Sequence, residues 1–297
     1  MTIPPIRKRW IISPTLLRRS NKLKKSFFGR AWASPHIVWA ILFIIAPICF
    51  VVYYAFTDSN GSFTLSNFSQ FSHYAPTLLL SLMLALISTT ICLVIGYPVA
   101  YAISRAKPTT QKILIMMLML PMWINFIIRT DSIAILIEKN GVINSLLQNV
   151  GLAINIMDTE AAVIIGMVYD FLPYMILPIY TVMTKIDNNL VEASSDLGCS
   201  GWQTMTKVIM PMSFSGICSG VTMVFVPCVS TFYISQRLGG TNTYLIGDEI
   251  EAKFMSLTQN YNVGAMLSCV LMVLIVISTL ILNHYSDGDD ARGGMVR

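Results

Sequence analysis

The sequence predicts an all-α integral membrane protein with six transmembrane helices and with both termini in the cytoplasm. Three observations support this class. Of the 297 residues, 55% are hydrophobic and only 12% are charged, whereas soluble domains carry about 25% charged residues. Six apolar segments are each long enough to cross a bilayer. Lys and Arg gather in alternate connections between these segments. A soluble enzyme, a disordered chain and a nucleic-acid-binding protein are therefore not expected.

The expected spans are continuously apolar rather than alternating, which favours helices over barrel strands. They cover residues 36–56, 77–103, 113–136, 161–183, 213–235 and 264–284. The apolar run of the first is about 20 residues long, beyond the usual 7–15 of a signal peptide. We therefore expect it to be retained as a transmembrane helix.

The distribution of basic residues predicts the orientation. Sixteen Lys and Arg lie in the termini and in the connections 104–112 and 184–212, and three lie in the other connections. The former are expected in the cytoplasm. The resulting domains are a basic N-terminal arm of residues 1–35, a transmembrane domain of residues 36–284 and a cytoplasmic tail of residues 285–297. The arm is expected to act as a topology signal or to lie on anionic membrane lipid.

Prolines and glycines are expected to interrupt the spans, as in a bundle that changes conformation. The expected breaks are Pro47, Gly96 with Pro98, Pro121, Pro173 with Pro178, and Pro227. The six Cys form no CxxC pair and the three His are far apart. Neither a disulfide framework nor a metal site is therefore expected.

The connection 185–211 predicts two short helices joined by a turn. Asn188 or Asn189 is expected to cap the first helix and Ser200 the second. Gly198 is expected to end the first and Pro211 the second. The apolar positions expected to face inward are Leu190, Ala193 and Leu197, followed by Trp202, Met205, Val208 and Ile209.

Glu192 and Asp196 are expected on the outer side of this loop, where a cytoplasmic partner can dock. The loop resembles the signature of ATP-binding-cassette (ABC) importer permeases: EAA, three residues, Gly, nine residues, then Ile-x-Leu-Pro. The matching residues are Glu192, Ala193, Ser194, Gly198, Val208, Met210 and Pro211. The departures, Ser, Val and Met, are conservative in size. An ordinary amphipathic connector is the alternative.

Within this family the chain is similar to spermidine/putrescine permeases from about residue 65 to about residue 270. The segments that carry the likeness are 65–68, 96–100, 121–125, 128–129, 163–166, 168–169, 232–235, 239–240, 245–247, 254 and 264–265. The N-terminal arm and the Asp-rich tail lie outside it. These segments identify the substrate less specifically than the loop identifies the family, because polyamine permeases are similar in sequence to permeases for other small solutes.

The resemblance implies a type I importer fold in a bacterial cytoplasmic membrane, in a heterodimer with a second homologous permease. It also implies two cytoplasmic ATPase subunits and an extracytoplasmic polyamine-binding protein. The residues implied in ATPase coupling are Glu192, Ala193, Asp196, Gly198 and Pro211. The chain itself is expected to be no enzyme and to hold no cofactor, since ATP binds the partner and the sequence has no GxxxxGK[ST] motif.

A polyamine pathway requires carboxylates, carbonyl oxygens and aromatic faces, because the substrate is a flexible polycation. Asp170 lies in the middle of the fourth span beside Tyr169 and is a candidate for attracting an amine. The alternative is an interior hydrogen-bonding role at Pro173. Trp123 and Asn125, after Pro121, are the second candidate pair, with helix packing as the alternative.

Other charges near the outer side are given structural roles. Arg129 and Asp131 are expected to pair with neighbours or to reach the interface, on different faces of their helix. Glu249 and Glu251 are expected to be solvated, the alternative being contact with the binding protein or the entering amine.

Three alternative functions remain at this point. The first is an ABC importer permease for another small solute, such as an amino acid or an anion. The second is a secondary transporter, which predicts inverted repeats and ion-coordinating groups near the midplane. The third is a membrane enzyme, disfavoured because no His, Cys or paired carboxylates converge on one membrane face.

Overall fold

The computed structural model describes residues 35–58, 60–142, 144–145, 156–241, 243–255 and 260–293, with side chains up to residue 284. The chain divides into two compact units, of which the first ends at Tyr53 and the second begins at Tyr54. In the described ranges the regular elements are all helical, and one isolated bridge joins Thr57 and Phe63. Most of the predicted arm and the last four residues lie outside these ranges.

The first predicted span is observed as a helix over Pro35–Ala55. It includes a π-helical stretch, η1 (Ile41–Ile45), followed by α2 (Ala46–Ala55). Pro47 does not end this helix, and the π-helical stretch η1 lies just before it. The part of this helix up to Tyr53 belongs to the first unit.

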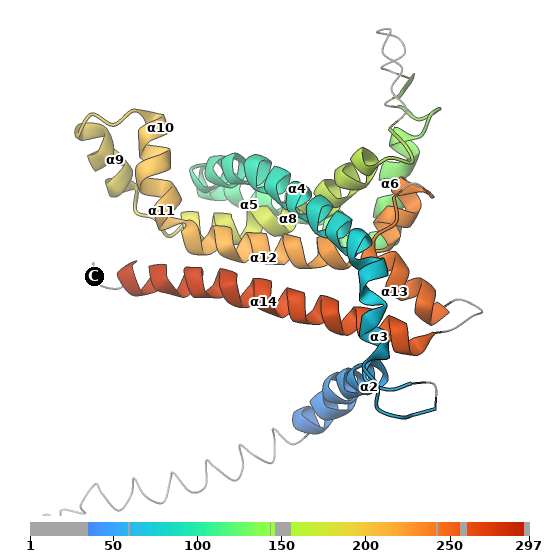
Figure 1. Cartoon of the computed structure of the whole chain (residues 1–297). Coiled ribbons are helices and arrows are strands. Elements are labelled where there is room, and N and C mark those ends of the chain that lie inside the picture. Colours follow the sequence, from blue (N-terminus) through green and yellow to red (C-terminus); the bar gives the residue numbers. More distant parts are fainter. Residues whose placement is uncertain are drawn as a thin grey trace, which may run out of the picture. The chain divides into compact units, whose positions relative to one another are not determined.

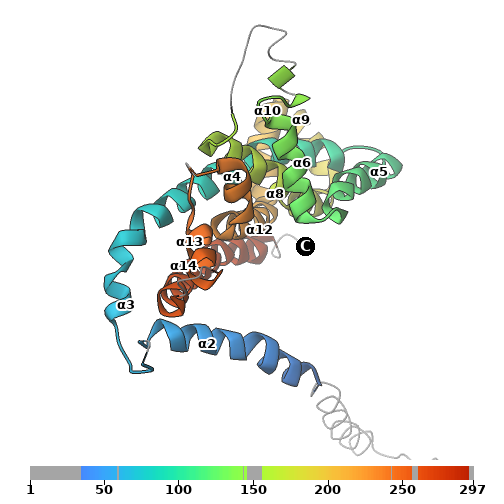
Figure 2. The same cartoon turned by 90° about the vertical axis from the view of Figure 1, so that its right-hand side faces the viewer.

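Four long helices build the second unit, after the short helix α3 (Ser66–Ser69). They are α4 (Phe71–Ser104), α8 (Glu160–Met183), α12 (Phe214–Ser230) and α14 (Tyr261–Gly293). α4 and α12 both pack on α8, and α14 runs beside α12 (Figures 1 and 2). In the most apolar stretch of α8, 56% of the residues are buried. α8 is therefore the centre of the bundle.

Small residues allow the neighbours of α8 to approach its backbone. A Cβ added at Gly220 of α12 would lie 3.0 Å from the Met175 carbonyl oxygen, and one at Gly96 of α4 would lie 3.1 Å from the Met175 side chain. Close packing of this kind replaces the hydrophobic effect as the force that joins helices in lipid. Large buried side chains fill the remaining space, among them Met167, Met175, Ile176, Ile179 and Met266.

The expected proline breaks are observed at one site only. α4 continues through Pro98, α8 through Pro173 and Pro178, and α12 through Pro227. In these positions the neighbouring helices support the backbone that proline leaves unpaired. The expectation of a break was wrong there. At Pro121 the helix does break.

The third predicted span consists of three pieces: α5 (Pro108–Met119), the 3₁₀-helix η2 (Leu120–Trp123) and α6 (Phe126–Ile137). The chain bends by 95° between η2 and α6. A second bent pair, at 72°, joins Gly201–Met212 to α12. The described residues therefore contain four helices able to span a membrane, or six spans when each bent pair counts as one.

After α12 the chain forms the π-helix η4 (Ser235–Gly239) and the short helix α13 (Ile246–Met255). Asp248 is buried and joins these two elements. One of its carboxylate oxygens accepts a hydrogen bond from the Leu245 amide at 2.7 Å, and the other accepts from the Ser235 hydroxyl at 3.0 Å. Burial raises the pKa of the Asp248 carboxyl from 3.8 to about 6.

This raised pKa predicts a pH-dependent stability. The folded protein favours the protonated Asp248, so its contribution is full below about pH 4 and is lost as pH rises through 6. We expect Asp248→Asn to remove this component, because the amide keeps a carbonyl oxygen for the Leu245 amide and carries no charge. Thermal unfolding of the purified protein between pH 4.5 and 7.5 measures the effect. Identical pH profiles for the wild type and the variant would contradict it.

Candidate coupling loop and transport pathway

The predicted pair of short helices is present between α8 and α12. α9 (Asn188–Asp196) is followed by α10 (Gly201–Thr204), the π-helix η3 (Met205–Ile209) and α11 (Met210–Met212). A buried hydrogen bond of 2.9 Å between the Ser194 and Thr204 hydroxyls joins α9 to α10. We refer to residues 187–213 as the coupling loop.

The turn and the two helix caps of the coupling loop test the local predictions. Gly198 follows α9 with a φ of +81° and open space around its Cβ position. Backbone conformation, not crowding, therefore explains the glycine. Ser200 caps α10 in a capping box with Gln203, as predicted. The cap of α9 is Asp187, whose carboxylate accepts from the Asn189 amide at 3.0 Å.

Asn188 and Asn189 were therefore wrongly expected to cap α9; they are its first two residues. A carboxylate is a favourable cap because it also interacts with the positive end of the helix dipole. Pro211 lies one residue before the end of the helix Gly201–Met212, as expected, and the chain bends by 72° before α12.

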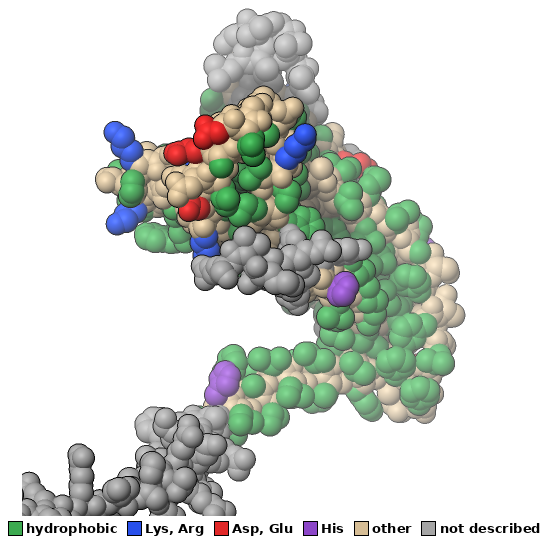
Figure 3. Space-filling view, turned by 90° about the vertical axis from the view of Figure 1, so that its left-hand side faces the viewer, with side chains coloured by type: hydrophobic (Ala, Val, Ile, Leu, Met, Phe, Trp, Pro, Cys, Tyr) green, Lys and Arg blue, Asp and Glu red, His purple; other side chains and the backbone are tan. Residues whose placement is uncertain are grey.

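Several apolar side chains of the coupling loop face outward instead of inward. Leu197 is 85% exposed and Trp202 is 76% exposed, whereas Ile209 is fully buried. No other part of the described chain covers the Leu197 and Trp202 side chains. Glu192, Ala193 and Asp196 are exposed as well. Figure 3 shows acidic, basic and hydrophobic side chains together on the face that carries this loop.

An exposed Trp and Leu beside two carboxylates form a mixed apolar and acidic surface. We call Glu192, Asp196, Leu197 and Trp202 the docking surface. Tryptophan is enriched among the residues that dominate binding energy in protein interfaces. The geometry therefore supports association with a protein partner at this end of the bundle.

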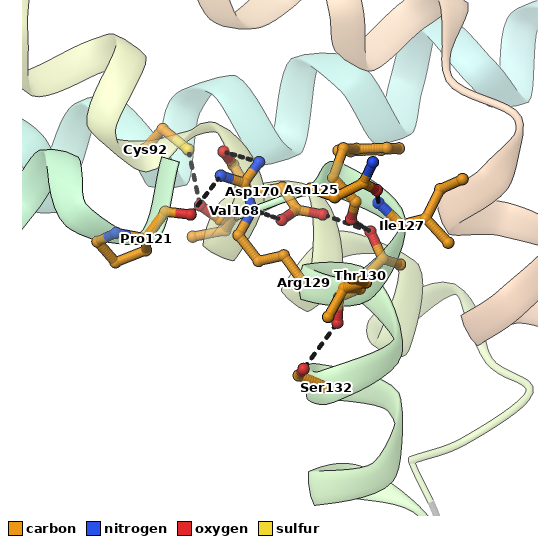
Figure 4. Close-up of polar contacts among 11 residues, drawn as sticks. Cys92, Pro121, Asn125, Ile127, Arg129, Thr130, Ser132, Val168 and Asp170 are labelled. Atoms are coloured by element: carbon orange, nitrogen blue, oxygen red, sulfur yellow. Dashed lines mark hydrogen bonds and ion pairs between the residues drawn. The ribbon is translucent and has the colours of Figure 1, made fainter. Parts of the chain in front are cut away.

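A buried ion pair joins the broken third span to α8. Arg129 of α6 donates through Nε to Asp170 of α8, with 6% and 0% of the two side chains exposed (Figure 4). Arg129 Nη2 also donates to the Asp170 carbonyl oxygen at 3.3 Å. The Thr130 hydroxyl contacts the second carboxylate oxygen at 2.8 Å. Both oxygens of Asp170 are thus engaged.

The same arginine reaches back across the 95° bend. Its Nη1 lies 3.5 Å from the carbonyl oxygen of Pro121, which precedes the break. On the other side of the bend, the Asn125 side chain caps α6 by accepting from the Ile127 amide at 2.8 Å. Arg129 and Asn125 therefore stabilise the bend from its two sides.

A second ion pair holds the other face of α6. The Asp131 carboxylate accepts from Arg237 Nε at 2.7 Å and from the Tyr233 hydroxyl at 3.1 Å. The expectation that Arg129 and Asp131 pair with different neighbours is confirmed. Opposite charges in two spans were the available signal for the Arg129–Asp170 pair, but the sequence does not say that α6 and α8 are neighbours.

The candidate pathway residues differ in exposure. Trp123 is 78% exposed and Tyr169 is 41% exposed, and Asn125 is exposed as well. Asp170, although next to Tyr169 in sequence, faces the interior. In this conformation its geometry favours the interior hydrogen-bonding role over direct contact with an amine. Of the outer carboxylates, Glu249 lies 4.0 Å from Lys253 and Glu251 accepts from Gln236.

Residues 18–287 match the family described as "Binding-protein-dependent transport system inner membrane component". The chain belongs to this family. As a binding-protein-dependent transport component it is a multi-pass subunit of the inner membrane and a transport protein, not an enzyme. The predictions of permease function and of membrane localisation are confirmed.

Individual relatives and solved structures agree with this family. The chain is 35% identical to the "Spermidine/putrescine transport system permease protein PotB" of Haemophilus influenzae over 83% of this chain and 89% of that protein. The PotB protein of Escherichia coli K12 is 34% identical over 82% of this chain and 92% of its own length.

Two solved importers share the fold. A bacterial ABC transporter for the import of alginate matches with a TM-score of 0.76 at 17% identity, over 91% of this chain and 98% of that one. The MetNI methionine ABC transporter matches with a TM-score of 0.54 at 18% identity, over 72% of this chain and 95% of that one. The type I importer permease fold is thereby confirmed.

The buried ion pair predicts a strong coupling between two substitutions. Removing one partner of such a pair costs about 3–5 kcal/mol, because it leaves an uncompensated charge in the interior. We expect Arg129→Met and Asp170→Asn each to reduce the yield of folded permease in membranes. The double variant is expected to lose less than the two separate losses combined.

The uptake kinetics of the double variant separate the two roles of Asp170. An interior partner predicts a KM near that of the wild type once folded protein is recovered. A raised KM with normal folding would instead assign Asp170 to the substrate. Strictly additive losses of yield would contradict the ion pair itself.

Proposed function

We propose that this chain is one of two homologous permease subunits of an ABC importer for spermidine and putrescine. The observation that carries the proposal is the 35% identity to a spermidine/putrescine permease over 83% of the chain. This match includes the spans and not only the coupling loop. In the proposed complex the chain binds no cofactor, two cytoplasmic ATPase subunits bind ATP, and an extracytoplasmic binding protein delivers the polyamine.

The proposed topology has six spans with both termini in the cytoplasm. Four spans are the long apolar helices, one is the bent pair of Pro108–Trp123 with α6, and one is α12, whose bent partner Gly201–Met212 belongs to the coupling loop. The sixteen-to-three distribution of Lys and Arg supports this orientation. It puts the coupling loop on the cytoplasmic side and α13 on the opposite side.

The docking surface is proposed to contact an ATPase subunit. Trp202 and Leu197 supply apolar contacts, and Glu192 and Asp196 supply charge complementarity. Gly198 allows the turn that places α9 against α10, and Ala193 and Pro211 complete the coupling residues. ATP binding can shift the permease between two states only if the ATPase contacts this surface differently in each.

The pathway is proposed to pass the bend of the third span, where Trp123 and Asn125 are exposed. Trp123 offers an aromatic face to an ammonium group, a contact worth roughly 0.5–2 kcal/mol. Tyr169 supplies a second aromatic side chain from α8. Asp170 is proposed to be an interior partner of Arg129 and Thr130 beside the pathway and not a ligand of the amine.

Charge reversal on α9 tests the coupling role. We expect Glu192→Lys to abolish ATP-dependent uptake while the permease remains in the membrane, because it places like charge against the partner. Glu138→Lys, the same reversal at another exposed position, is the matched control and is expected to retain uptake. Normal uptake by Glu192→Lys would contradict the proposed docking surface.

Competition experiments test the substrate. We expect the reconstituted complex to import labelled spermidine, with putrescine as a competitor and with no competition from anions or amino acids. The physical reason is that aromatic and oxygen ligands favour a polycation. Import of an anion or an amino acid in place of spermidine would establish a permease for another solute. Uptake driven by an ion gradient without ATP would support a secondary transporter.

A further inference from the structure

Side chains of α4 hold the coupling loop at both of its ends. At the entry, Arg105 donates through Nη1 to the side-chain oxygen of Asn188, the first residue of α9. At the exit, the buried Tyr97 hydroxyl lies 3.1 Å from the hydroxyl of Ser213, the residue before α12. A movement of the loop relative to the bundle must therefore stretch or break contacts with α4.

The surroundings of Arg105 make its contact with the coupling loop sensitive to such a movement. Its guanidinium lies 5.6 Å from the centre of the Tyr101 ring, and its Nε and Nη2 atoms are buried without a hydrogen-bond partner among the described residues. The positive end of α9 repels a cation. The Asn188 side-chain oxygen offsets this repulsion, so a displacement of α9 removes the hydrogen bond that Arg105 makes to the coupling loop.

The end of α4 near the loop is itself braced against two other helices. Gln111 of α5 donates to the carbonyl oxygens of Ser104 and Ala106 at 2.9 and 2.8 Å. The Ser104 carbonyl is among the last ones of α4, which the end of a helix leaves unpaired, and the Ala106 carbonyl follows the helix. The Tyr180 hydroxyl of α8 donates to Gln111 at 3.2 Å. These hydrogen bonds keep the end of α4 ordered, so that a displacement of Arg105 moves the helix and does not merely unwind its last turn.

Near its other end, α4 contacts the start of α13. The hydroxyl of Ser81, which is fully buried, accepts a hydrogen bond of 2.8 Å from the Ile246 amide. Ser81 and Tyr97 are separated by about 24 Å along a helix with a rise of 1.5 Å per residue. The coupling loop and α13 lie at opposite ends of α12 (Figure 1).

The start of α13 has little freedom to move independently. A Cβ at Gly247 would lie 2.3 Å from the carbonyl oxygen of Thr231, so α13 begins in direct contact with the segment that follows α12. Asp248 adds its two hydrogen bonds to Leu245 and Ser235. A displacement of Ser81 is therefore passed on to the segment that leads into α13.

We infer that α4 transmits the state of the coupling loop to α13, with Arg105, Tyr97 and Ser81 as positioning residues. The inference rests on the proposed function, in which the loop docks to an ATPase. Arg105 and Tyr97 sense the position of the loop at its two ends. Ser81 moves α13 through its hydrogen bond with the Ile246 amide. In the proposed topology, α13 lies on the side of the membrane where the binding protein docks.

The test uses the full complex of permeases, ATPases and binding protein in vesicles. Asn188→Ala with Tyr97→Phe removes both loop contacts by small changes and leaves Arg105 in place. We expect the amount of spermidine imported per ATP hydrolysed to fall by at least about fivefold, as for the loss of a typical coupling between two sites. Ser81→Ala is expected to have the same effect from the other end of α4.

Matched controls remove similar groups from other positions. Lys107→Gln neutralises an exposed cation at the same end of the bundle, and Tyr174→Phe removes a hydroxyl from α8. Both are expected to retain the wild-type ratio of import to hydrolysis. A ratio reduced equally by the controls would overturn the inference, because the effect would then not be specific to α4.

Hydrogen exchange separates transmission from a merely structural role. In the wild type, a non-hydrolysable ATP analogue is expected to change the exchange of the amides in both α9 and α13. In Asn188→Ala with Tyr97→Phe, the change in α9 is expected to persist and the change in α13 to disappear. A persisting change in α13 would overturn the inference, even if the variant assembles poorly.

The outcome is distinct from that of the proposed function. Loss of uptake in Glu192→Lys with a normal ratio in the α4 variants would refute only the inference. Normal uptake in Glu192→Lys would refute the docking surface.

Discussion

The ion pair between Arg129 and Asp170 is the interaction on which the rest of the second unit depends. It holds a span that is bent by 95° against α8, the most buried helix of the bundle. A charge inside a membrane protein is costly unless it is paired, so the two residues constrain each other's position. Arg129 also contacts the Pro121 carbonyl oxygen, which couples the bend to the pair.

A second constraint is the absence of water as a hydrogen-bonding partner within the bilayer. The long helices pair most of their own backbone groups and continue through Pro98, Pro173, Pro178 and Pro227, although each proline leaves one carbonyl group without its helical amide partner. Polar side chains instead join elements where the chain leaves a helix. Asn125, Gln111, Asp248 and Ser200 each satisfy backbone groups at such an end.

The coupling loop and the α4 contacts together describe a mechanical route through the chain. The loop presents apolar and acidic side chains that the permease itself does not cover, and the proposed ATPase partner would cover them. α4 touches the loop at Asn188 and Ser213 and touches α13 through Ser81. Binding energy at one end of the bundle can thus reach the other through direct contacts. No long-range electrostatic effect is required.

The sequence by itself determined the helical membrane class, the span positions to within a few residues and the coupling loop with its Gly198 turn. These features follow from local hydropathy and backbone preference. Only the tertiary structure decided which charges meet, because Arg129 and Asp170 are 41 residues apart and no periodicity links them. It also decided that Trp202 and Leu197 face outward and that most prolines leave their helices intact. Both depend on neighbours, which a local pattern does not contain.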